Sequence, residues 1–199
     1  MRIGFRSNSH PGTVAFKKCV LVCLAVILIA PAAYGVYRWE QGNFAVVSAE
    51  AVYRSRQLDA HELADIIRHY RIRSILNLRG KNHGADWYRE EVWAAGILNV
   101  HLYDYGISAN RDLDEAEIAD LIAILHDAPK PLLIHCKSGA DRTSLVAALY
   151  LYEVEGISSS TASNQLSLLY GHLPALLGSS TQAMDRTFWR HVGGYRLLR

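Results

Sequence analysis

The sequence predicts an α/β domain with a central, mostly parallel sheet of four to five strands and helices on both faces, preceded by an N-terminal transmembrane helix. Three observations predict this class. From about residue 40 onward, short β-rich runs alternate with helical ones; residues 143–152, after the last predicted strand, are almost continuously apolar; and residues 19–37 carry no charge. Alternating strands and helices favour a parallel sheet whose two faces are both covered by helices.

The elements follow one another in a regular order. Strands are predicted at 51–55, 74–78, 100–105 and 132–135, and helices at 59–70, 86–95, 114–126, 143–152, 159–170 and 182–191. The helix over 59–70 has Leu63, Ile66 and Ile67 on one face. The helix over 114–126 takes Asp112 or Asp114 as its N-cap. This pattern leaves one domain of about the usual size, with no internal repeat.

Composition excludes several classes of protein. The 199 residues are 50% hydrophobic and 20% charged, which excludes a disordered chain. The formal net charge of +2, with acidic residues interleaved throughout, lacks the basic footprint of a nucleic-acid-binding protein. The three cysteines, Cys19, Cys23 and Cys136, provide neither a disulfide framework nor zinc-ligand spacing. We therefore expect no nucleic-acid partner, no metal and no cofactor.

The uncharged N-terminal stretch is long enough to cross a membrane as a helix. Lys17 and Lys18 precede it, and aromatic residues follow it, so we expect a cytoplasmic segment over 1–18, a transmembrane helix over 19–39 and a folded domain over 40–199 on the non-cytoplasmic, periplasmic side. Two alternatives remain. Ala30-Pro31-Ala32 has the form of a signal-peptide cleavage site, and a buried core helix is the third interpretation.

The residues between the fourth predicted strand and the next helix carry the chemistry. Cys136 stands at the strand end, and five residues separate it from Arg142 at the helix start. This arrangement gathers backbone N–H groups around one point, as phosphate-binding loops do, and Gly139 permits the sharp turn. The helix N-terminus and Arg142 favour the thiolate form of Cys136, and Lys137 adds positive charge at the rim. We expect the sulfur to be open to solvent and the guanidinium to face it across a cavity.

The loop HCKSGADRT resembles the signature loop of the cysteine-dependent protein tyrosine phosphatases, in particular the compact dual-specificity branch. VYRSRQLD and SILNLRG are also similar to that branch, so the likeness covers roughly residues 51–155. The resemblance implies that Cys136 is the nucleophile, that Arg142 binds phosphate and the transition state, and that Thr143 steadies the thiolate leaving group. The residues it implies for substrate binding are Lys137, Ser138, Gly139, Ala140, Asp141 and Arg142. One departure is Ser144, where the family usually has glycine.

The general acid has two candidates. Asp104 follows the third predicted strand, where the family's mobile-loop aspartate is normally found, and Asp141 stands directly before Arg142, as in some related phosphatases. The alternative for Asp141 is that its carboxylate pairs with a neighbouring cation and orders the loop. His135 is expected to be a buried residue that hydrogen-bonds the loop. Arg54 and Arg79 end strands of the same sheet. They can either reach the site or make surface ion pairs, and we favour the surface pairs.

Three functions fit these residues. The first is a phosphomonoester hydrolase of the protein tyrosine or dual-specificity type, which forms a phosphocysteine intermediate on a phosphorylated protein. The second keeps that chemistry but acts on a membrane lipid phosphate or phosphoinositide. The third is a non-catalytic, phosphate-binding pseudophosphatase. Sulfur transfer or arsenate reduction is disfavoured, because the chain beyond the apolar stretch has no second cysteine for a redox relay.

Overall fold

The computed structural model describes residues 11–173 and 181–196. The chain divides into two compact units, Met1–Tyr37 and Arg38–Arg199. The first described helix, α1 (Pro11–Glu40), includes the predicted N-terminal helix. Over the two described ranges, no helix combines the length and the apolar character needed to cross a membrane. The transmembrane span predicted over 19–39 is therefore not supported, although the segment is helical.

The second unit is built on a five-stranded sheet with the order β1-β2-β5-β3-β4. The strands are β1 (Ala45–Ser48), β2 (Val52–Ser55), β3 (Ser74–Asn77), β4 (His101–Asp104) and β5 (Leu132–His135). Only the pairing of β1 with β2 is antiparallel. The register aligns the last residues of the four parallel strands: His135 pairs with Ser55 and with Asn77, and Asn77 pairs with Asp104. The four strands thus end level, at one edge of the sheet.

Capping side chains mark where two of the main helices begin. The main helices of this unit are α2 (Ala60–Tyr70), α3 (Asp86–Ile97), α4 (Glu115–Asp127), α5 (Asp141–Leu149), which continues as a π-helical turn at Tyr150–Val154, and α7 (Gln182–Arg196). Asp59 and Glu62 form a reciprocal capping box at the start of α2, and Asp114 and Glu117 form another at α4. Of the two predicted N-caps for α4, Asp114 is confirmed.

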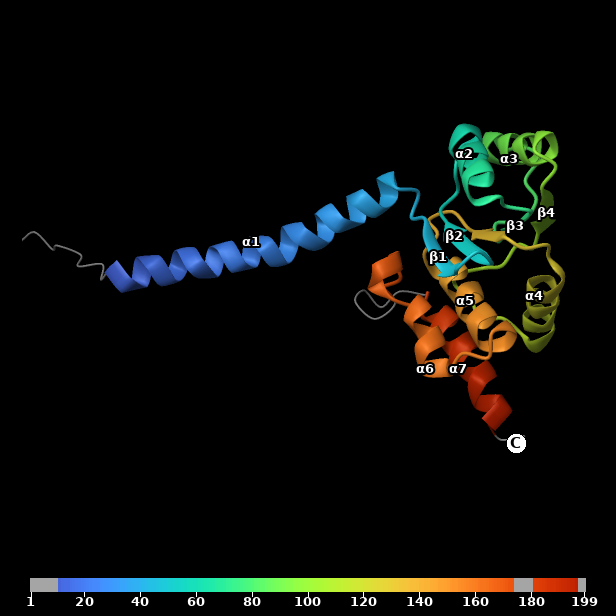
Figure 1. Ribbon diagram of the computed structural model, residues 1–199. Coiled ribbons are helices and arrows are strands. Elements are labelled where there is room, and N and C mark those ends of the chain that lie inside the picture. Colours follow the sequence, from blue (N-terminus) through green and yellow to red (C-terminus); the bar gives the residue numbers. More distant parts are fainter. Residues whose placement is uncertain (1–10, 174–180, 197–199) are drawn as a thin grey trace, which may run out of the picture. The chain divides into compact units, whose positions relative to one another are not determined.

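The helices cover both faces of the sheet, and alternate strand residues supply the two cores (Figure 1). On one face, Ile75 and Leu133 pack among buried side chains of α2 and α3. On the other, Leu76 and Ile134 pack among side chains of α4, α5 and α7. Helix α5 is buried over seven consecutive residues, from Thr143 to Leu149, because β5, α6 (Ser159–Ala162) and α7 pack against it. The predicted α/β class is confirmed for this domain.

Two elements differ from the predictions. Strand β1 was not predicted; it has four residues, pairs with β2 alone and has an irregular register at Val46 and Ser48, so its periodicity is weak. The helix predicted over 159–170 is instead the single turn α6 followed by two 3-10 turns, Ser163–Gln165 and Leu168–Tyr170. The helix does not continue here, because the buried Gln165 accepts hydrogen bonds from an arginine of β2.

Candidate active site

The predicted strand–loop–helix arrangement lies in the middle of the sheet. Strand β5 is buried on every residue and lies between β2 and β3. Residues 136–140 form the loop at its carboxyl end, and α5 starts at Asp141. Ligands of α/β proteins bind at this edge, beyond the carboxyl ends of parallel strands. The loop is therefore placed where β2 and β3 can both contribute side chains to it.

Gly139 is required by the shape of this loop. Its φ is +68°, in the left-handed region, and a Cβ added there would lie 2.5 Å from the carbonyl oxygen of Ser55 and 2.6 Å from the backbone nitrogen of Arg56. Those atoms belong to the backbone at the end of β2, so they cannot move aside as a flexible side chain can. The loop thus packs directly against β2, and only glycine fits the contact.

Three successive carbonyl groups of the loop are held from the same neighbouring region of the chain. The contacts are Gln57 N to Lys137 O at 3.2 Å, Asn43 Nδ2 to Ser138 O at 3.0 Å and Arg54 Nη2 to Gly139 O at 2.7 Å. In a planar trans peptide the C=O and the following N–H point in opposite directions. The N–H groups of residues 138–140 are therefore turned away from these donors, and none of them has a backbone acceptor among the described residues. A row of N–H groups free to bind an oxyanion is the result.

Cys136 and Thr143 lie deep in this arrangement. Cys136 is a free thiol and only 1% exposed, which differs from the expectation of a sulfur open to solvent. Thr143 is fully buried, and within the described chain its Oγ1 has no hydrogen-bond partner. A buried hydroxyl without a partner is uncommon and calls for an explanation. The sulfur therefore lies at the base of the loop. The other predicted loop residues differ in solvent exposure: Lys137 is exposed, Ser138 is partly buried and Ala140 is buried.

Arg142 connects the loop to the two strands on its far side. Its Nη1 donates to the carbonyl of Leu78, after β3, at 3.1 Å and to the carbonyl of Ile107, after β4, at 3.3 Å. The sequence predicts that this guanidinium faces the sulfur; in the structure, one of its nitrogens is bound to backbone carbonyls. A guanidinium has five N–H donors, so Nε and Nη2 can still form a bidentate contact with phosphate.

Arg54 corrects an expectation, because it makes no surface ion pair. It is 0% exposed, although it lies in β2. Besides Gly139, its Nη2 donates to Ser144 Oγ at 2.8 Å, and its Nη1 donates to Gln165 Oε1 at 2.7 Å. Its guanidinium lies 3.9 Å from the ring centroid of Tyr170. Ser144, which departs from the family pattern, is thus an acceptor for this buried arginine.

Arg79, expected at the surface, faces the site as well. It follows β3, its guanidinium stacks 3.4 Å from the ring centroid of Trp87, and its Nη1 donates to Gln57 Oε1 at 3.0 Å. Burial lowers the pKa of Arg79, and the positive charge of Arg142 lowers it further. Two guanidinium groups therefore lie close enough to repel each other at the rim of the loop.

Asp104, the leading acid candidate, ends β4 at the same sheet edge. Its Oδ1 accepts a hydrogen bond from Asn77 Nδ2 at 2.8 Å, and its Oδ2 accepts one from the hydroxyl of Tyr88 at 2.7 Å. Burial and the hydrogen bond to Asp104 raise the pKa of Tyr88 to about 12, so the phenol remains a donor at neutral pH. The carboxylate is thereby fixed between β3 and α3.

Asp141, the second candidate, is bound to a buried histidine. Asp141 Oδ1 lies 2.7 Å from His172 Nδ1, and the opposite ring nitrogen lies 2.9 Å from Asp185 Oδ2. Burial alone lowers the pKa of His172, but the hydrogen bonds to the two carboxylates outweigh it and raise that pKa to about 9. His172 is therefore a cation at neutral pH. This geometry fits the alternative interpretation of Asp141, in which its carboxylate pairs with a neighbouring cation.

His135 does not make the contact that the sequence predicts. Its Nε2 lies 2.5 Å from Glu91 Oε1 of α3, and both side chains are almost fully buried. Its Nδ1 has no hydrogen-bond partner in the part of the chain that the structure describes. His135 thus joins the end of β5 to α3, on the side of the sheet away from α5, rather than bonding to the loop.

Comparison with known proteins places this geometry in a family. A family model described as "Tyrosine phosphatase family" matches residues 34–163, which include every strand and the whole cysteine loop. The chain belongs to the tyrosine phosphatase family. This membership supports a cysteine-dependent phosphatase. Among curated protein sequences, none matches this chain.

Solved structures of similar fold include phosphatases from bacteria and yeast. TpbA of P. aeruginosa, solved in complex with pTyr, is 20% identical with a TM-score of 0.59; the match covers 79% of this chain and 90% of that chain. The catalytic core of SIW14 from S. cerevisiae, a PP-IP phosphatase solved with citrate, is 21% identical with a TM-score of 0.58, covering 77% and 90%. Tk-PTP in its active form is 16% identical with a TM-score of 0.52, covering 74% and 97%. At these identities the likeness shows a common fold.

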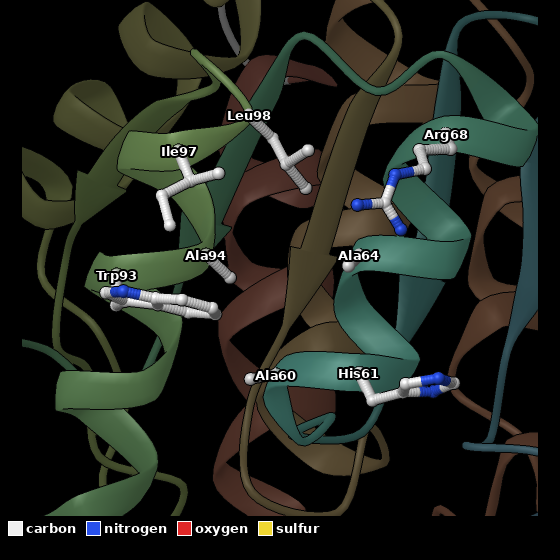
Figure 2. Close-up of a pocket in the computed structure, with 8 residues that line it drawn as sticks. All are labelled: Ala60, His61, Ala64, Arg68, Trp93, Ala94, Ile97 and Leu98. Atoms are coloured by element: carbon white, nitrogen blue, oxygen red, sulfur yellow. The ribbon is translucent and has the colours of Figure 1, made fainter.

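A separate hollow lies between α2 and α3, away from the loop. It has a volume of about 330 Å³ and is lined from the two helices by the side chains that Figure 2 shows. Trp93 and Ile97 of α3 face it and are more than half exposed. No residue of the cysteine loop lines it. The aromatic residues of α3 thus have three different surroundings, with Trp87 under Arg79, Tyr88 on Asp104 and Trp93 in this hollow.

Proposed function

We propose that this protein hydrolyses phosphomonoesters in the manner of protein tyrosine and dual-specificity phosphatases, through a phosphocysteine intermediate on Cys136. The single observation that carries the proposal is the loop of residues 136–140. The carbonyls of residues 137–139 accept hydrogen bonds from outside the loop, and the N–H groups of residues 138–140 have no backbone acceptor among the described residues. That arrangement binds the three equatorial oxygens of a phosphoryl group and stabilises the charge that they carry in the transition state.

The reaction takes place in two displacements. The Cys136 thiolate attacks phosphorus in line, an S–P bond forms, and the P–O bond to the alcohol or phenol breaks as a carboxylic acid protonates the leaving oxygen. Water then attacks the phosphocysteine, the same carboxylate takes a proton from it, and the S–P bond breaks to release inorganic phosphate and the thiolate. The partner-free Oγ1 of Thr143 supports its role as the donor to that thiolate. The start of α5 adds a partial positive charge behind the loop.

For the acid we propose Asp104. It lies at the level of the loop on the carboxyl edge of the sheet, whereas Asp141 is bound to a cationic His172. Asp104→Asn is expected to slow hydrolysis of alkyl phosphates, whose leaving groups need a proton, far more than that of p-nitrophenyl phosphate. Asp141→Asn serves as the matched comparison. If Asp141→Asn shows this leaving-group dependence and Asp104→Asn does not, the assignment is reversed.

The decisive experiment is hydrolysis of p-nitrophenyl phosphate by the full-length protein and three variants. Cys136→Ser is expected to abolish phosphate release, and Arg142→Lys to lower kcat/KM by about 100-fold or more, because a lysine cannot make the bidentate contact. Cys19→Ser is the control, since Cys19 lies in α1, and it is expected to leave the rate unchanged. Absence of turnover in the wild type, with phosphate still bound, supports the pseudophosphatase alternative instead.

Two substrate classes remain, and one observation favours the second. TpbA was solved with pTyr, which supports a phosphotyrosyl protein as substrate. The second guanidinium at the rim, Arg79, favours a substrate that carries another anionic group, as phosphoinositides do. Arg79→Gln separates the two classes. It is expected to raise KM for a soluble inositol bisphosphate several-fold while leaving KM for p-nitrophenyl phosphate within about twofold. Equal effects on both would favour the phosphotyrosyl class.

A further inference from the structure

Arg54 is a fully buried cation with neutral hydrogen-bond acceptors. Its guanidinium donates to the carbonyl of Gly139, to the hydroxyl of Ser144, and to the carbonyl and side-chain oxygens of Gln165. Within residues 11–173 and 181–196, no carboxylate lies within ion-pair distance of it. Removing a charge from water without a counter-ion is costly, so buried arginines are normally paired with an acid. The protein therefore keeps an uncompensated positive charge inside the domain.

The Arg54 guanidinium lies close enough to Cys136 for their opposite charges to attract each other. Burial lowers the pKa of Arg54 to about 9, and the attraction of Tyr170 and Cys136 partly offsets this effect. At neutral pH the guanidinium is still protonated. The Arg54 guanidinium carbon lies 3.9 Å from the ring centroid of Tyr170. The negative face of the ring balances the positive charge only in part. The thiolate of Cys136 is therefore the negative charge that can balance Arg54 inside the domain.

Arg54 also fixes the loop mechanically. One guanidinium nitrogen, Nη2, holds both the last carbonyl of the loop and the hydroxyl of Ser144 in the first turn of α5. The other, Nη1, is anchored on Gln165. A planar fork can satisfy these acceptors in one orientation, whereas a lysine ammonium on its flexible stem cannot span them. The buried arginine thus ties β2, the loop and α5 together.

Other charged groups also face the region around Cys136 and Arg54. From the elements packed around Cys136 and Arg54 they are Arg79 after β3, Arg142 in α5, Tyr170 in the 3-10 turn, Arg38 at the end of α1 and Glu91 in α3. Arg54 differs from Arg79 and Arg142, because it is not at the rim and is 0% exposed. Substrate cannot displace its contacts, so its effect is present in the free enzyme.

We propose that Arg54 is a positioning residue of the cysteine loop: it holds the Gly139 carbonyl outward and is the buried counter-ion of the Cys136 thiolate. The proposal rests on the function proposed above, but its first readout does not need turnover. Arg54 is fully buried, and its hydrogen bonds are all to groups of the protein itself. It acts through the loop backbone and through the charge on sulfur.

The test is the pH dependence of iodoacetamide alkylation at Cys136, followed by peptide mass spectrometry on full-length protein. Arg54→Gln is expected to move the alkylation midpoint upward by about 1 pH unit, and so to slow alkylation about tenfold at a pH below both midpoints, because an opposite charge nearby shifts a titration by that order. Cys19 in the same sample is the internal reference and should not change. Arg73→Gln is the matched control, since Arg73 is exposed and its side-chain contact is the carbonyl of Lys130.

The conservative variant Arg54→Lys separates the effect of the charge from that of the planar guanidinium. It also provides a test if Arg54→Gln fails to fold. Arg54→Lys keeps the charge but cannot reach all the acceptors, so its alkylation midpoint should stay near that of the wild type while kcat on p-nitrophenyl phosphate falls at least tenfold. An unchanged midpoint in folded Arg54→Gln, or a wild-type kcat in Arg54→Lys, overturns the proposal. If no form of the protein hydrolyses phosphate but the midpoint shift is present, the counter-ion role stands and the proposed function fails.

Discussion

Replacing Gly139 by alanine tests the packing of the loop against β2. The backbone of Gly139 has a φ of +68°, and the added Cβ would lie 2.5 Å from Ser55 O and 2.6 Å from Arg56 N. Gly156 provides a matched control in the same chain, because its φ is +66° but nothing lies within 4 Å of an added Cβ. The two substitutions therefore share the same backbone strain and differ in the collision.

The expected losses of stability follow from the backbone strain and from the collision of the added Cβ. A left-handed conformation costs a non-glycine residue about 1–2 kcal/mol, which is the whole effect expected at Gly156. Overpacking against backbone that cannot rotate away adds about 1–3 kcal/mol at Gly139. Gly139→Ala is therefore expected to destabilise the protein by about 2–5 kcal/mol, clearly more than Gly156→Ala. Relief of the collision moves the loop off β2, so activity should fall along with stability.

Urea unfolding of both variants, followed by circular dichroism, measures the free-energy differences, and p-nitrophenyl phosphate hydrolysis below the transition measures the site. We expect Gly156→Ala to retain wild-type activity and Gly139→Ala to lose most of it even where it is folded. Equal destabilisation by the two substitutions, or a fully active Gly139→Ala, would show that the loop does not depend on its contact with β2.

Two other predictions concern the carboxylates. Since the folded-state pKa of His172 is raised to about 9 above its ordinary value of 6.5, its stabilising effect is fully present below pH 6.5 and is lost as the pH rises through 9. Each pKa unit corresponds to about 1.4 kcal/mol. The wild type should therefore be more stable than His172→Gln at pH 6, and this difference in the free energy of unfolding should shrink by up to about 3 kcal/mol when the pH is raised to 9.5. A difference that does not change with pH would contradict this. Tyr88→Phe removes one of the two anchors of Asp104 and should lower kcat on alkyl phosphates while sparing p-nitrophenyl phosphate, whereas an equal loss on both would dissociate Asp104 from the leaving group.

The strands and the loop were predictable because their signals are local. The four parallel strands lie within about a residue of their predicted ranges, since short β-rich runs end at polar residues such as Asn77 and Asp104. The cysteine, the glycine and the arginine at fixed spacing define the loop without reference to the rest of the chain. The N-terminal span shows the opposite case, where an uncharged stretch gave a membrane prediction that the described helices do not support.

The residues that hold the loop were not predictable, because they meet it only after folding. Arg54 reads as a polar residue at the end of a strand, and nothing local shows that the turns at 163–170 close over it. Asn43 reaches Ser138 across 95 positions of sequence, and His172 reaches Asp141 across 31. The burial of Arg54 could be suspected only because its strand lies next to β5, and that neighbour is known only once the strand order is known.

Direct trapping of the phosphoenzyme tests the central claim. Full-length protein is mixed with p-nitrophenyl phosphate, quenched in acid within one turnover and digested, and the peptide that contains Cys136 is weighed. The account predicts one added phosphoryl group on that peptide and none on the same peptide of Cys136→Ser. Steady phosphate release with no phosphoryl group on Cys136, or with the group on another residue, would contradict it.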